Sequence, residues 1–400
     1  MPRSLVSPQS HTSHTVLSSG VLSNTVVVGY TYESGIDPSI IPWGSLTHLV
    51  LAFFSVDQSG NVVPGSNTSP QSIVDLAHKN DVKVIASIGG SGDGSTVLAQ
   101  VLSSNTTCTH MAADLANKIK EYNLDGVDFD LEFPNTAQQI QDLYVALKGT
   151  RFALDAAFGA RNKTLTMTLY SSKGLLGPSA PQTDAKPFSD VVDYGLLMAY
   201  DFFGSWAEIS APNSPFYDVP GYPGLSFTSS IAAWLKSGWD PKKLVAGLPY
   251  YGRTAIVSAT TAGAKTQFMP NSGAASPGGP VSKITGAWTW TDLRDPKDGA
   301  LKTPQEAQQG WQRNWDSTTE TPWLLHNDSQ TYIGYDDLDS LAIKANHIIT
   351  SGLVGAMVWM VNYDYKGELG SVVANYTAAY SSHVKPCLNE CCIQHLSSAV

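Results

Sequence analysis

Three carboxylates alternate with large apolar residues in one short stretch of the chain. Asp128, Asp130 and Glu132 occupy every second position, and valine, phenylalanine and leucine precede or separate them. Because successive side chains of a strand point to opposite faces, the three carboxylates would share one face. Like charges held together on an otherwise apolar strand raise each other's pKa, which keeps one carboxyl protonated near working pH. Such a carboxyl can act as a general acid.

Other interpretations of this spacing remain open. The acids could lie on a solvated strand face, but the residues beside them are large and apolar, and Gly126 and Pro134 bound the segment. Alternating aspartates can also hold magnesium in phosphoryl-transfer enzymes. A calcium-binding loop is disfavoured, because no glycine follows Asp130 where the sharp turn of that loop would require one.

The composition predicts a soluble protein with a neutral, polar surface. Four hundred residues, 42% of them hydrophobic, are enough for one barrel-sized domain or two smaller ones. Only 14% of the residues are charged, and the net charge of -10 argues against nucleic acid or an anionic membrane as partner. No apolar run reaches the roughly 18 residues of a membrane-spanning helix.

Five glycosylation acceptor patterns favour an extracellular location. They begin at Asn67, Asn105, Asn162, Asn327 and Asn375. We expect a secreted glycoprotein on this basis, although residues 1–22 are polar, contain prolines and show no signal peptide.

Both ends of the chain lack periodicity, and we expect residues 1–22 and 379–400 to be disordered. Cys387, Cys391 and Cys392 lie in the tail and Cys108 stands alone in the body of the chain. This is neither a disulfide framework nor a pattern of paired zinc ligands.

Between these ends, residues 23–378 alternate β-branched runs with helical patterns. Eight strands are predicted, at residues 25–30, 46–54, 82–88, 124–132, 165–170, 191–200, 244–248 and 354–359. Eight such strand–helix units predict a (β/α)₈ TIM barrel, with its catalytic groups at the carboxyl ends of the strands. An open doubly wound sheet would carry a glycine-rich phosphate loop after its first strand, and residues 29–32 do not form one.

The connection between the seventh and eighth strands is too long for a bare loop. We predict a small α+β insertion at residues 254–334 within the catalytic barrel domain. Residues 304–315 are expected to be helical and residues 323–333 to form a hairpin that turns near Asn327. Asp336 or Asp337 is expected to cap a helix at residues 338–348.

The segment Asp125-Gly126-x-Asp128-x-Asp130-x-Glu132 resembles the signature of glycoside hydrolase family 18, the chitinase-like family. Further motifs match that family in order: Ser87-Ile88-Gly89-Gly90, Met198-Ala199-Tyr200-Asp201, residues 247–253 and residues 355–359. The resemblance spans about residues 25–378. It implies a TIM barrel that hydrolyses β-1,4 bonds between N-acetylglucosamine units of chitin or chitooligosaccharides, without metal or organic cofactor.

The resemblance also implies a retaining, substrate-assisted mechanism. Glu132 would be the acid/base that protonates the glycosidic oxygen, while the acetamido oxygen of the substrate attacks the anomeric carbon. Asp130 would accept the acetamido N–H and stabilise the oxazolinium, and Asp128 would share a proton or hydrogen bond with Asp130. Tyr200 would hydrogen-bond the acetamido oxygen, and Asp201 would help to orient the distorted sugar.

Nine further residues match substrate-binding positions of the family: Trp359, Tyr30, Phe53, Met198, Trp206, Tyr251, Arg253, Gly89 and Gly90. Trp359 resembles the tryptophan that forms the floor of the subsite for the distorted sugar, whereas each of the other side chains could equally be part of the core. Asp125 and Gly126 match structural positions. Many members have a tryptophan directly after Gly-Gly, but this chain has Ser91 there, so it departs from the family on the leaving-group side.

Three other functions remain as alternatives. The same acids serve endo-β-N-acetylglucosaminidases that cleave N-glycans. A family 18 barrel without catalysis can be a chitin-binding lectin, although lectins normally lack the acid/base residue and Glu132 is present. A metal-dependent phosphoryl-transfer enzyme is the third alternative, and it would be sensitive to EDTA. We expect a monomer in each case.

Overall fold

The computed structural model describes residues 25–33, 37–65, 69–171, 176–180, 184–258, 266–274 and 276–383, with side chains described up to residue 375. The predictions for residues 1–22, for the three tail cysteines and for the acceptor at Asn67 lie outside these residues. The last helix, α9 (Glu368–His383), continues past residue 379, where we predicted the tail to begin, so that boundary was wrong.

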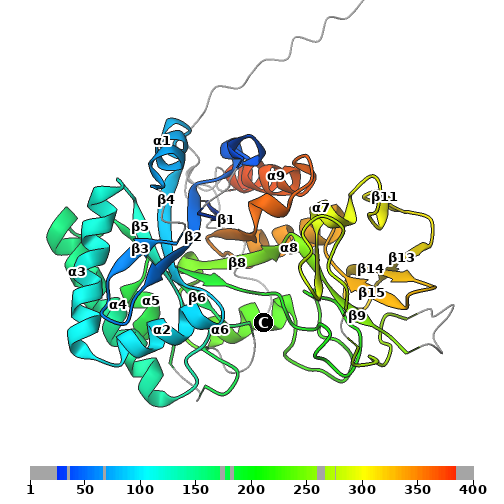
Figure 1. Ribbon diagram of the computed structural model, residues 1–400, viewed down its shortest axis with the longest axis horizontal. Coiled ribbons are helices and arrows are strands. Elements are labelled where there is room, and N and C mark those ends of the chain that lie inside the picture. The colour runs from blue at the N-terminus through cyan, green and yellow to red at the C-terminus, as the bar shows by residue number, and fades with distance from the viewer. Residues whose placement is uncertain are drawn as a thin grey trace, which may run out of the picture.

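Eight parallel strands close into a barrel, which confirms the predicted fold (Figure 1). The strands are β1 (Val26–Tyr32), β2 (His48–Val56), β4 (Lys83–Gly89), β5 (Gly126–Asp130), β6 (Thr164–Leu169), β7 (Tyr194–Leu197), β8 (Leu244–Pro249) and β16 (Gly355–Trp359). Strand β1 pairs with both β16 and β2, so the first and last barrel strands are neighbours. A short strand, β3 (Val62–Pro64), runs antiparallel to β2.

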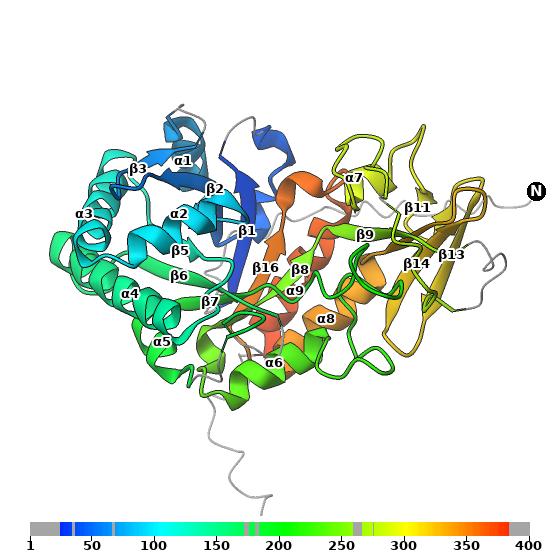
Figure 2. The same cartoon turned by 60° about the horizontal axis from the view of Figure 1, so that its bottom comes forward.

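Helices surround the barrel on its outside (Figure 2). The crossover helices are α1 (Gln71–Lys79), α2 (Asp93–Leu102), α3 (Asn105–Glu121), α4 (Ala137–Phe158), α5 (Lys186–Val191), α6 (Phe227–Lys236) and α8 (Leu338–Thr350). Short 3₁₀ helices lie at Pro38–Ile40, Trp43–Ser45, Pro241–Lys243 and Val361–Tyr363. Among the described residues, no helix combines the length and apolar character needed to cross a membrane.

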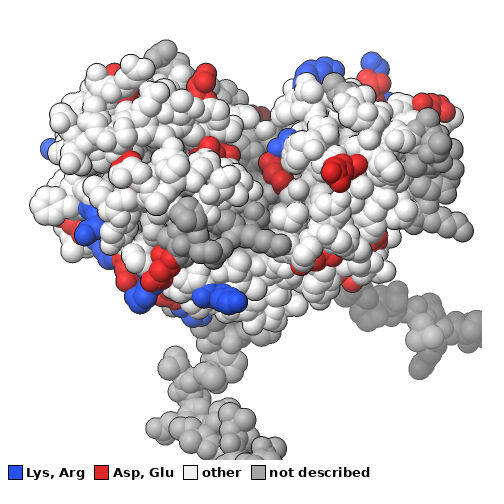
Figure 3. Space-filling model, turned by 90° about the horizontal axis from the view of Figure 1, so that it is seen from below, with Lys and Arg blue, Asp and Glu red and all other residues white. Residues whose placement is uncertain are grey.

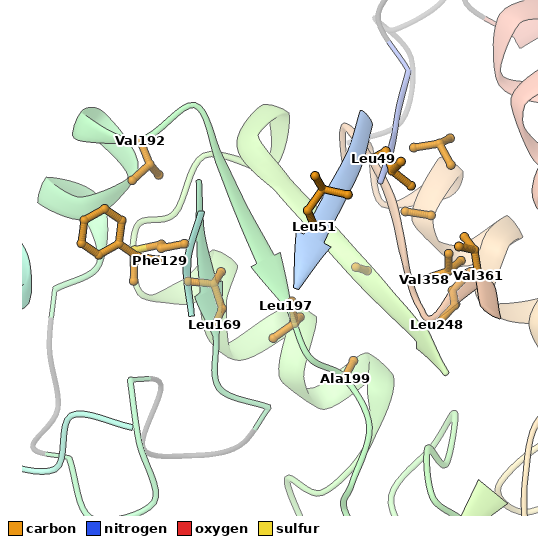
Figure 4. Close-up of a cluster of buried hydrophobic side chains, with 14 of the residues drawn as sticks. Leu49, Leu51, Phe129, Leu169, Val192, Leu197, Ala199, Leu248, Val358 and Val361 are labelled. Carbon is orange, nitrogen blue, oxygen red and sulfur yellow. The ribbon is translucent and has the colours of Figure 1, made fainter. Parts of the chain in front are cut away.

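The alternation of side chains along each strand divides the core into two layers. Outward-facing residues such as Leu51, Phe129 and Leu248 pack between the strands and the helices (Figure 4). Inward-facing residues such as Val28 and Ile85 fill the barrel itself. This alternation sends the acidic positions of β5 into the barrel, because the apolar positions between them are required on the outer face.

A second sheet lies beside the barrel, as Figures 1 and 2 show. It has the antiparallel order β10-β9-β15-β14-β13. Its strands are β9 (Tyr251–Ile256), β10 (Ala287–Thr289), β13 (Trp311–Asp316), β14 (Thr321–His326) and β15 (Thr331–Gly334), and the short helix α7 (Trp290–Leu293) follows β10. The predicted boundary at residue 254 therefore falls inside β9, and the sheet begins at Tyr251.

The helix predicted at residues 304–315 was wrong. This segment contains β12 (Glu306–Ala307), which pairs with β11 (Leu301–Thr303), and most of β13. Trp311 and Trp315 are four residues apart, a spacing that places two side chains on one face of a helix and equally on one face of a strand. In the structure, residues of β13 form six antiparallel pairs with residues of β14, so the segment is a strand.

The two other predictions for this region are confirmed. Strands β14 and β15 form an antiparallel hairpin whose turn contains Asn327. Helix α8 begins after Asp337, whose carboxylate accepts the backbone N–H groups of Asp339 and Ser340.

The face drawn in Figure 3 is mostly uncharged, with scattered acidic and basic side chains, as the low content of charged residues predicted.

Candidate active site

A cavity of about 340 Å³ lies where the carboxyl ends of β5, β7 and β16 face the second sheet. Eight of the predicted site residues line it: Asp130, Glu132, Met198, Tyr200, Asp201, Tyr251, Arg253 and Trp359. The carboxyl end of a barrel is the position at which TIM barrels carry their catalytic groups.

Asp128 lies inside the barrel beneath this cavity and is completely buried. Its Oδ2 accepts hydrogen bonds from the Tyr30 hydroxyl at 2.8 Å and the Ser87 hydroxyl at 2.7 Å. Its Oδ1 accepts one from the Thr166 hydroxyl at 2.7 Å. Burial raises the pKa of Asp128, and these three hydrogen bonds oppose the rise because they stabilise the carboxylate.

Asp130 is buried one position nearer the cavity on the same inner face, at the end of β5. Its Oδ1 accepts a hydrogen bond from the Thr168 hydroxyl at 2.8 Å. Burial, followed by the charges of Glu132 and Asp128, raises the pKa of Asp130 well above its usual value. The three carboxylates of the sequence motif are therefore coupled electrostatically, as their spacing predicted.

Glu132 follows β5 and is half-buried at the cavity. Its backbone N–H donates to the Ser95 hydroxyl of α2 at 2.7 Å, which fixes the turn after the strand. Burial, followed by the charge of Asp201, raises the pKa of Glu132 to about 7, and Arg253 opposes this rise. A glutamate with this pKa holds a proton in weakly acidic solution and can release it to a substrate.

Asp201 follows β7, and its carboxylate is bonded to two residues of the second sheet. Its carboxylate accepts hydrogen bonds from the Tyr251 hydroxyl at 2.6 Å and from two guanidinium nitrogens of Arg253, each at 2.6 Å. The Arg253 guanidinium also lies 5.2 Å from the ring centre of Trp206, which is 59% exposed at the rim. The pKa of Tyr251 is raised well above its usual value by burial and by the charge of Asp201.

Trp359 and Tyr200 line the inner end of the cavity, and further aromatic and sulfur groups pack behind them. Trp359 is half-buried, with its ring centre 5.3 Å from that of Tyr30 and 6.1 Å from that of Phe53. The hydroxyl of Tyr200 lies 3.6 Å from the sulfur of Met357, beneath the cavity. Burial and the surrounding carboxylates keep the pKa of Tyr200 well above its usual value, so its hydroxyl remains a donor.

Comparison with known proteins matches residues 26–364 to the family model of glycosyl hydrolases family 18. This match covers most of the chain. The chain belongs to that family.

Two similar relatives are an endochitinase of Manduca sexta, 25% identical over 82% of the chain, and a chitinase-like effector of Moniliophthora roreri, 27% identical over 84%. The chain spans 61% of the length of the first and 88% of the second. Among solved structures, a chitinase of Rhizomucor miehei has a TM-score of 0.78 at 22% identity, with 88% of this chain and 99% of that chain covered. That likeness shows that the two chains share the barrel fold.

The family 18 motif residues that do not reach the cavity lie elsewhere in the barrel. Asp125 precedes β5 and points away from the site, where its Oδ2 accepts from Val84 N–H at 2.8 Å and lies 2.7 Å from His78 Nε2. Gly126 lies so close to the neighbouring strand that an added Cβ would be 2.2 Å from the carbonyl oxygen of Thr164. Both residues therefore have structural contacts.

Gly89 and Gly90 lie at the end of β4 beside Asp130, and neither is among the residues that line the cavity. Both have positive φ, and an added Cβ on Gly89 would lie 2.2 Å from the backbone oxygen of Asp130. Gly90 N–H donates to that same oxygen at 2.8 Å, and an added Cβ on Gly90 would lie 2.8 Å from the ring of Phe53. These glycines let the β4 loop approach the acidic strand closely.

Five residues that line the cavity were not predicted: Ser91, Ile284, Ala287, Thr289 and Tyr363. Three of them, Ile284, Ala287 and Thr289, lie in β10 or in the loop before it, where no family 18 motif was recognised. Their only sequence signal was the length of the insertion.

Among the described residues, no group of three or more His, Cys, Asp or Glu is arranged to hold a metal ion.

The raised pKa of Glu132 predicts a change in stability with pH. Its pKa is about 7 in the folded protein against an ordinary value of 4.5. Between these values the folded chain binds a proton that the unfolded chain does not, so stability falls as the pH rises through this window. We expect Glu132→Gln to remove this fall, so that its melting temperature exceeds that of the wild type by a margin that grows across the window. Thermal unfolding of both proteins at several pH values checks this, and a margin that stays constant with pH would contradict it.

Proposed function

We propose that this chain is a chitinase that hydrolyses β-1,4 bonds between N-acetylglucosamine units of chitin or chitooligosaccharides. The observation that carries the proposal is the position of Glu132. This glutamate, with a pKa of about 7, lies in the same cavity as Asp130, Tyr200 and Trp359. Cleavage of an N-acetylated sugar requires a proton donor, a buried carboxylate that can stabilise positive charge, and an aromatic surface for the sugar ring.

In the proposed first step Glu132 donates its proton to the glycosidic oxygen, and the bond from the anomeric carbon to that oxygen breaks. The acetamido oxygen of the substrate forms the new bond to the anomeric carbon, which gives an oxazolinium with a positive charge. Asp130 accepts the acetamido N–H and stabilises this charge from beneath the ring. Water then attacks the anomeric carbon while Glu132 takes a proton from the water. The bond from the anomeric carbon to the acetamido oxygen breaks, the N-acetyl group is restored, and the configuration is retained after two inversions.

The neighbours of Asp130 fit this role. Asp128 lies on the same inner face, and its charge contributes to the raised pKa of Asp130, so the pair can hold one proton between them. When positive charge develops on the substrate, the shared proton can move towards Asp128 and leave Asp130 anionic. The Tyr200 hydroxyl, kept protonated by its environment, serves as a donor to the acetamido oxygen.

Solved relatives support a saccharide as the ligand of this cavity. A family 18 chitinase of Cycas revoluta, which has a TM-score of 0.75 and is 23% identical to this chain, was solved in complex with (GlcNAc)₃. In the present chain, we propose that Trp359 packs against a pyranose ring and that Tyr251, Arg253 and Asp201 bind its hydroxyl or acetamido groups. Met198 and the exposed Trp206 would shape the rest of the surface, and the side chains and turn behind it, Phe53, the buried Tyr30 and Gly89–Gly90, would support it.

We further propose a secreted monomer. The acceptor asparagines Asn105, Asn162 and Asn375 are exposed in the structure and Asn327 is partly exposed, so each is accessible for glycosylation.

The wild-type protein tests this proposal against its alternatives. We expect it to release the fluorophore from a fluorogenic chitobiose glycoside in the presence of EDTA. Release from an N-glycoprotein but not from chitooligosaccharides would favour an endo-β-N-acetylglucosaminidase. Binding to chitin by folded protein, without any release of the fluorophore, would favour a lectin. Activity abolished by EDTA would favour the metal-dependent alternative.

The pH dependence of this activity provides a second test. Because Glu132 must be protonated, kcat/KM should fall above about pH 7. Asp201→Asn removes the charge that raises the pKa of Glu132 and leaves Arg253, which lowers it. We therefore expect the alkaline limb of the pH profile to move to lower pH in this variant. The exposed Asp298→Asn is the matched control and should leave the limb in place; a limb in Asp201→Asn at the wild-type pH would contradict this assignment.

A further inference from the structure

Asn213 is a completely buried amide that contacts two residues of the cavity at once. It lies in the connection between β7 and α6. Its Oδ1 accepts a hydrogen bond from the backbone N–H of Asp201 at 2.9 Å, and its Nδ2 donates to the backbone oxygen of Tyr251 at 3.0 Å. The side chains of Asp201 and Tyr251 are themselves joined by a hydrogen bond of 2.6 Å. Asn213 therefore fixes the backbones of two residues whose side chains meet in the cavity.

The backbone of Asp201 needs such support. Its φ is +60°, in the left-handed region that residues other than glycine rarely adopt. A conformation of this kind costs free energy and persists only where surrounding contacts impose it. The side-chain oxygen of Asn213 accepts the N–H of Asp201, and its backbone oxygen accepts the N–H of Phe202 at 3.1 Å. Two successive N–H groups after β7 thus depend on Asn213.

The residue after Asn213, Ser214, is held by hydrogen bonds to buried groups of the barrel. The hydroxyl of Ser214 donates to the backbone oxygen of Ala199 at 2.7 Å. The buried ammonium of Lys344 in α8 donates to the Ser214 backbone oxygen at 2.6 Å and forms an ion pair with Asp336, also at 2.6 Å. Lys344 and Asp336 are both buried, so breaking this pair would leave an uncompensated charge in the interior. Asn213 is consequently held in place by the fold and can hold Asp201 in turn.

A carboxamide is the group that these contacts require. The N–H of Asp201 needs an acceptor and the carbonyl of Tyr251 needs a donor, and an asparagine offers both in one plane. An ionised aspartate of the same shape would offer the acceptor alone. An alanine would remove both of these hydrogen bonds, one of which, to the Tyr251 carbonyl, is buried.

We propose that Asn213 is a positioning residue of the active site, which holds the Asp201 carboxylate and the Tyr251 hydroxyl in their places beside Glu132. This inference rests on the proposed function for the roles of Asp201 and Tyr251. Asn213 touches neither the cavity nor Glu132, and it acts on the reaction only through those two residues.

Asn213→Ala tests the proposal, with Gln267→Ala as the matched control. Gln267 is also a completely buried amide, with one donated bond, to Thr319, and one accepted bond, from Tyr332, but it contacts no residue of the cavity. Both variants should melt at lower temperature than the wild type. Only Asn213→Ala should lose kcat, by about 100-fold, the scale of a small misplacement of catalytic groups.

The pH profile separates positioning from a purely structural role. The charged groups that act on Glu132 are Asp130, Asp201 and Arg253, and of these Asn213 contacts Asp201 alone. Releasing Asp201 should move the alkaline limb to lower pH in Asn213→Ala, as in Asp201→Asn, while Gln267→Ala keeps the wild-type limb. The isosteric Asn213→Asp retains the acceptor for Asp201 and should keep more of kcat than the alanine variant does.

Wild-type kcat and an unmoved limb in both Asn213 variants would overturn the proposal, whatever their melting temperatures. If the wild type itself has no activity on chitooligosaccharides, the proposed function fails, and the inference is then decided by NMR titration of selectively labelled glutamate carboxyls. The titration of Glu132, assigned with Glu132→Gln, should move to lower pH in Asn213→Ala. An unchanged titration in that variant would reject the positioning role independently of catalysis.

Discussion

Replacing Glu132 with glutamine is expected to lower kcat/KM for a fluorogenic chitobiose glycoside by roughly 1,000-fold, within the range of general acid catalysis. Glutamine preserves the size of the side chain but has no proton to give to the glycosidic oxygen. The backbone N–H of Glu132, which donates to Ser95, is unchanged, so the turn after β5 should remain folded. Release of the fluorophore below pH 7, together with circular dichroism, measures both effects.

Substrates with different leaving groups test whether Glu132 acts by protonating the glycosidic oxygen. A dinitrophenolate leaves without protonation, whereas a fluorophore with a higher pKa depends on the acid. The loss caused by Glu132→Gln should therefore be much smaller for a dinitrophenyl chitobioside. Glu121→Gln, an exposed glutamate of α3, is the control and should leave both substrates unaffected. Equal losses for both leaving groups would show that Glu132 does not act by protonating the leaving group.

Much of the fold was predictable because the alternation of side chains along each strand matches the inner and outer faces of the barrel. The inner face of β5 carries Asp128 and Asp130, of which Asp130 lines the cavity. Its outer positions, such as Phe129, are apolar because they pack against the helices. That alternation is a property of neighbouring residues, so it is visible in the sequence. The coupling of Asp130 with Glu132 follows from the same spacing.

The parts that could not be predicted depend on residues distant in the chain. The spacing of the motif alone suggests that the aspartates of its own strand raise the pKa of Glu132. After burial, however, the largest cause is the charge of Asp201, which follows β7. Ile284 and Thr289 reach the cavity only because the second sheet lies beside the barrel. Asn213 had no motif at all, since its role consists of two bonds to backbone groups that the sequence does not place near one another.

Replacing Asp130 with asparagine is expected to lower kcat by roughly 100- to 1,000-fold, the scale measured when one group that stabilises a developing charge is removed. Asparagine has nearly the same shape, but it carries no charge to stabilise the oxazolinium, and its amide oxygen is a weaker acceptor for the acetamido N–H than a carboxylate. Hydrolysis of chitooligosaccharides under saturating substrate measures the loss. Thr168→Val, which removes the hydroxyl that donates to Asp130 at 2.8 Å, should lose less, because the carboxylate remains.

Azide distinguishes this role of Asp130 from that of a covalent nucleophile. If Asp130 formed a glycosyl-enzyme, Asp130→Ala would leave a space in which azide could attack the anomeric carbon and restore turnover as a glycosyl azide. In substrate-assisted hydrolysis the acetamido oxygen already occupies that face of the sugar, so azide should restore nothing. The wild type should also fail to cleave chitooligosaccharides from which the acetyl groups have been removed, since these lack the attacking oxygen. Rescue of Asp130→Ala by azide, or wild-type cleavage of a fully deacetylated substrate, would replace the oxazolinium with a covalent intermediate on Asp130 and leave Glu132 as the acid in either mechanism.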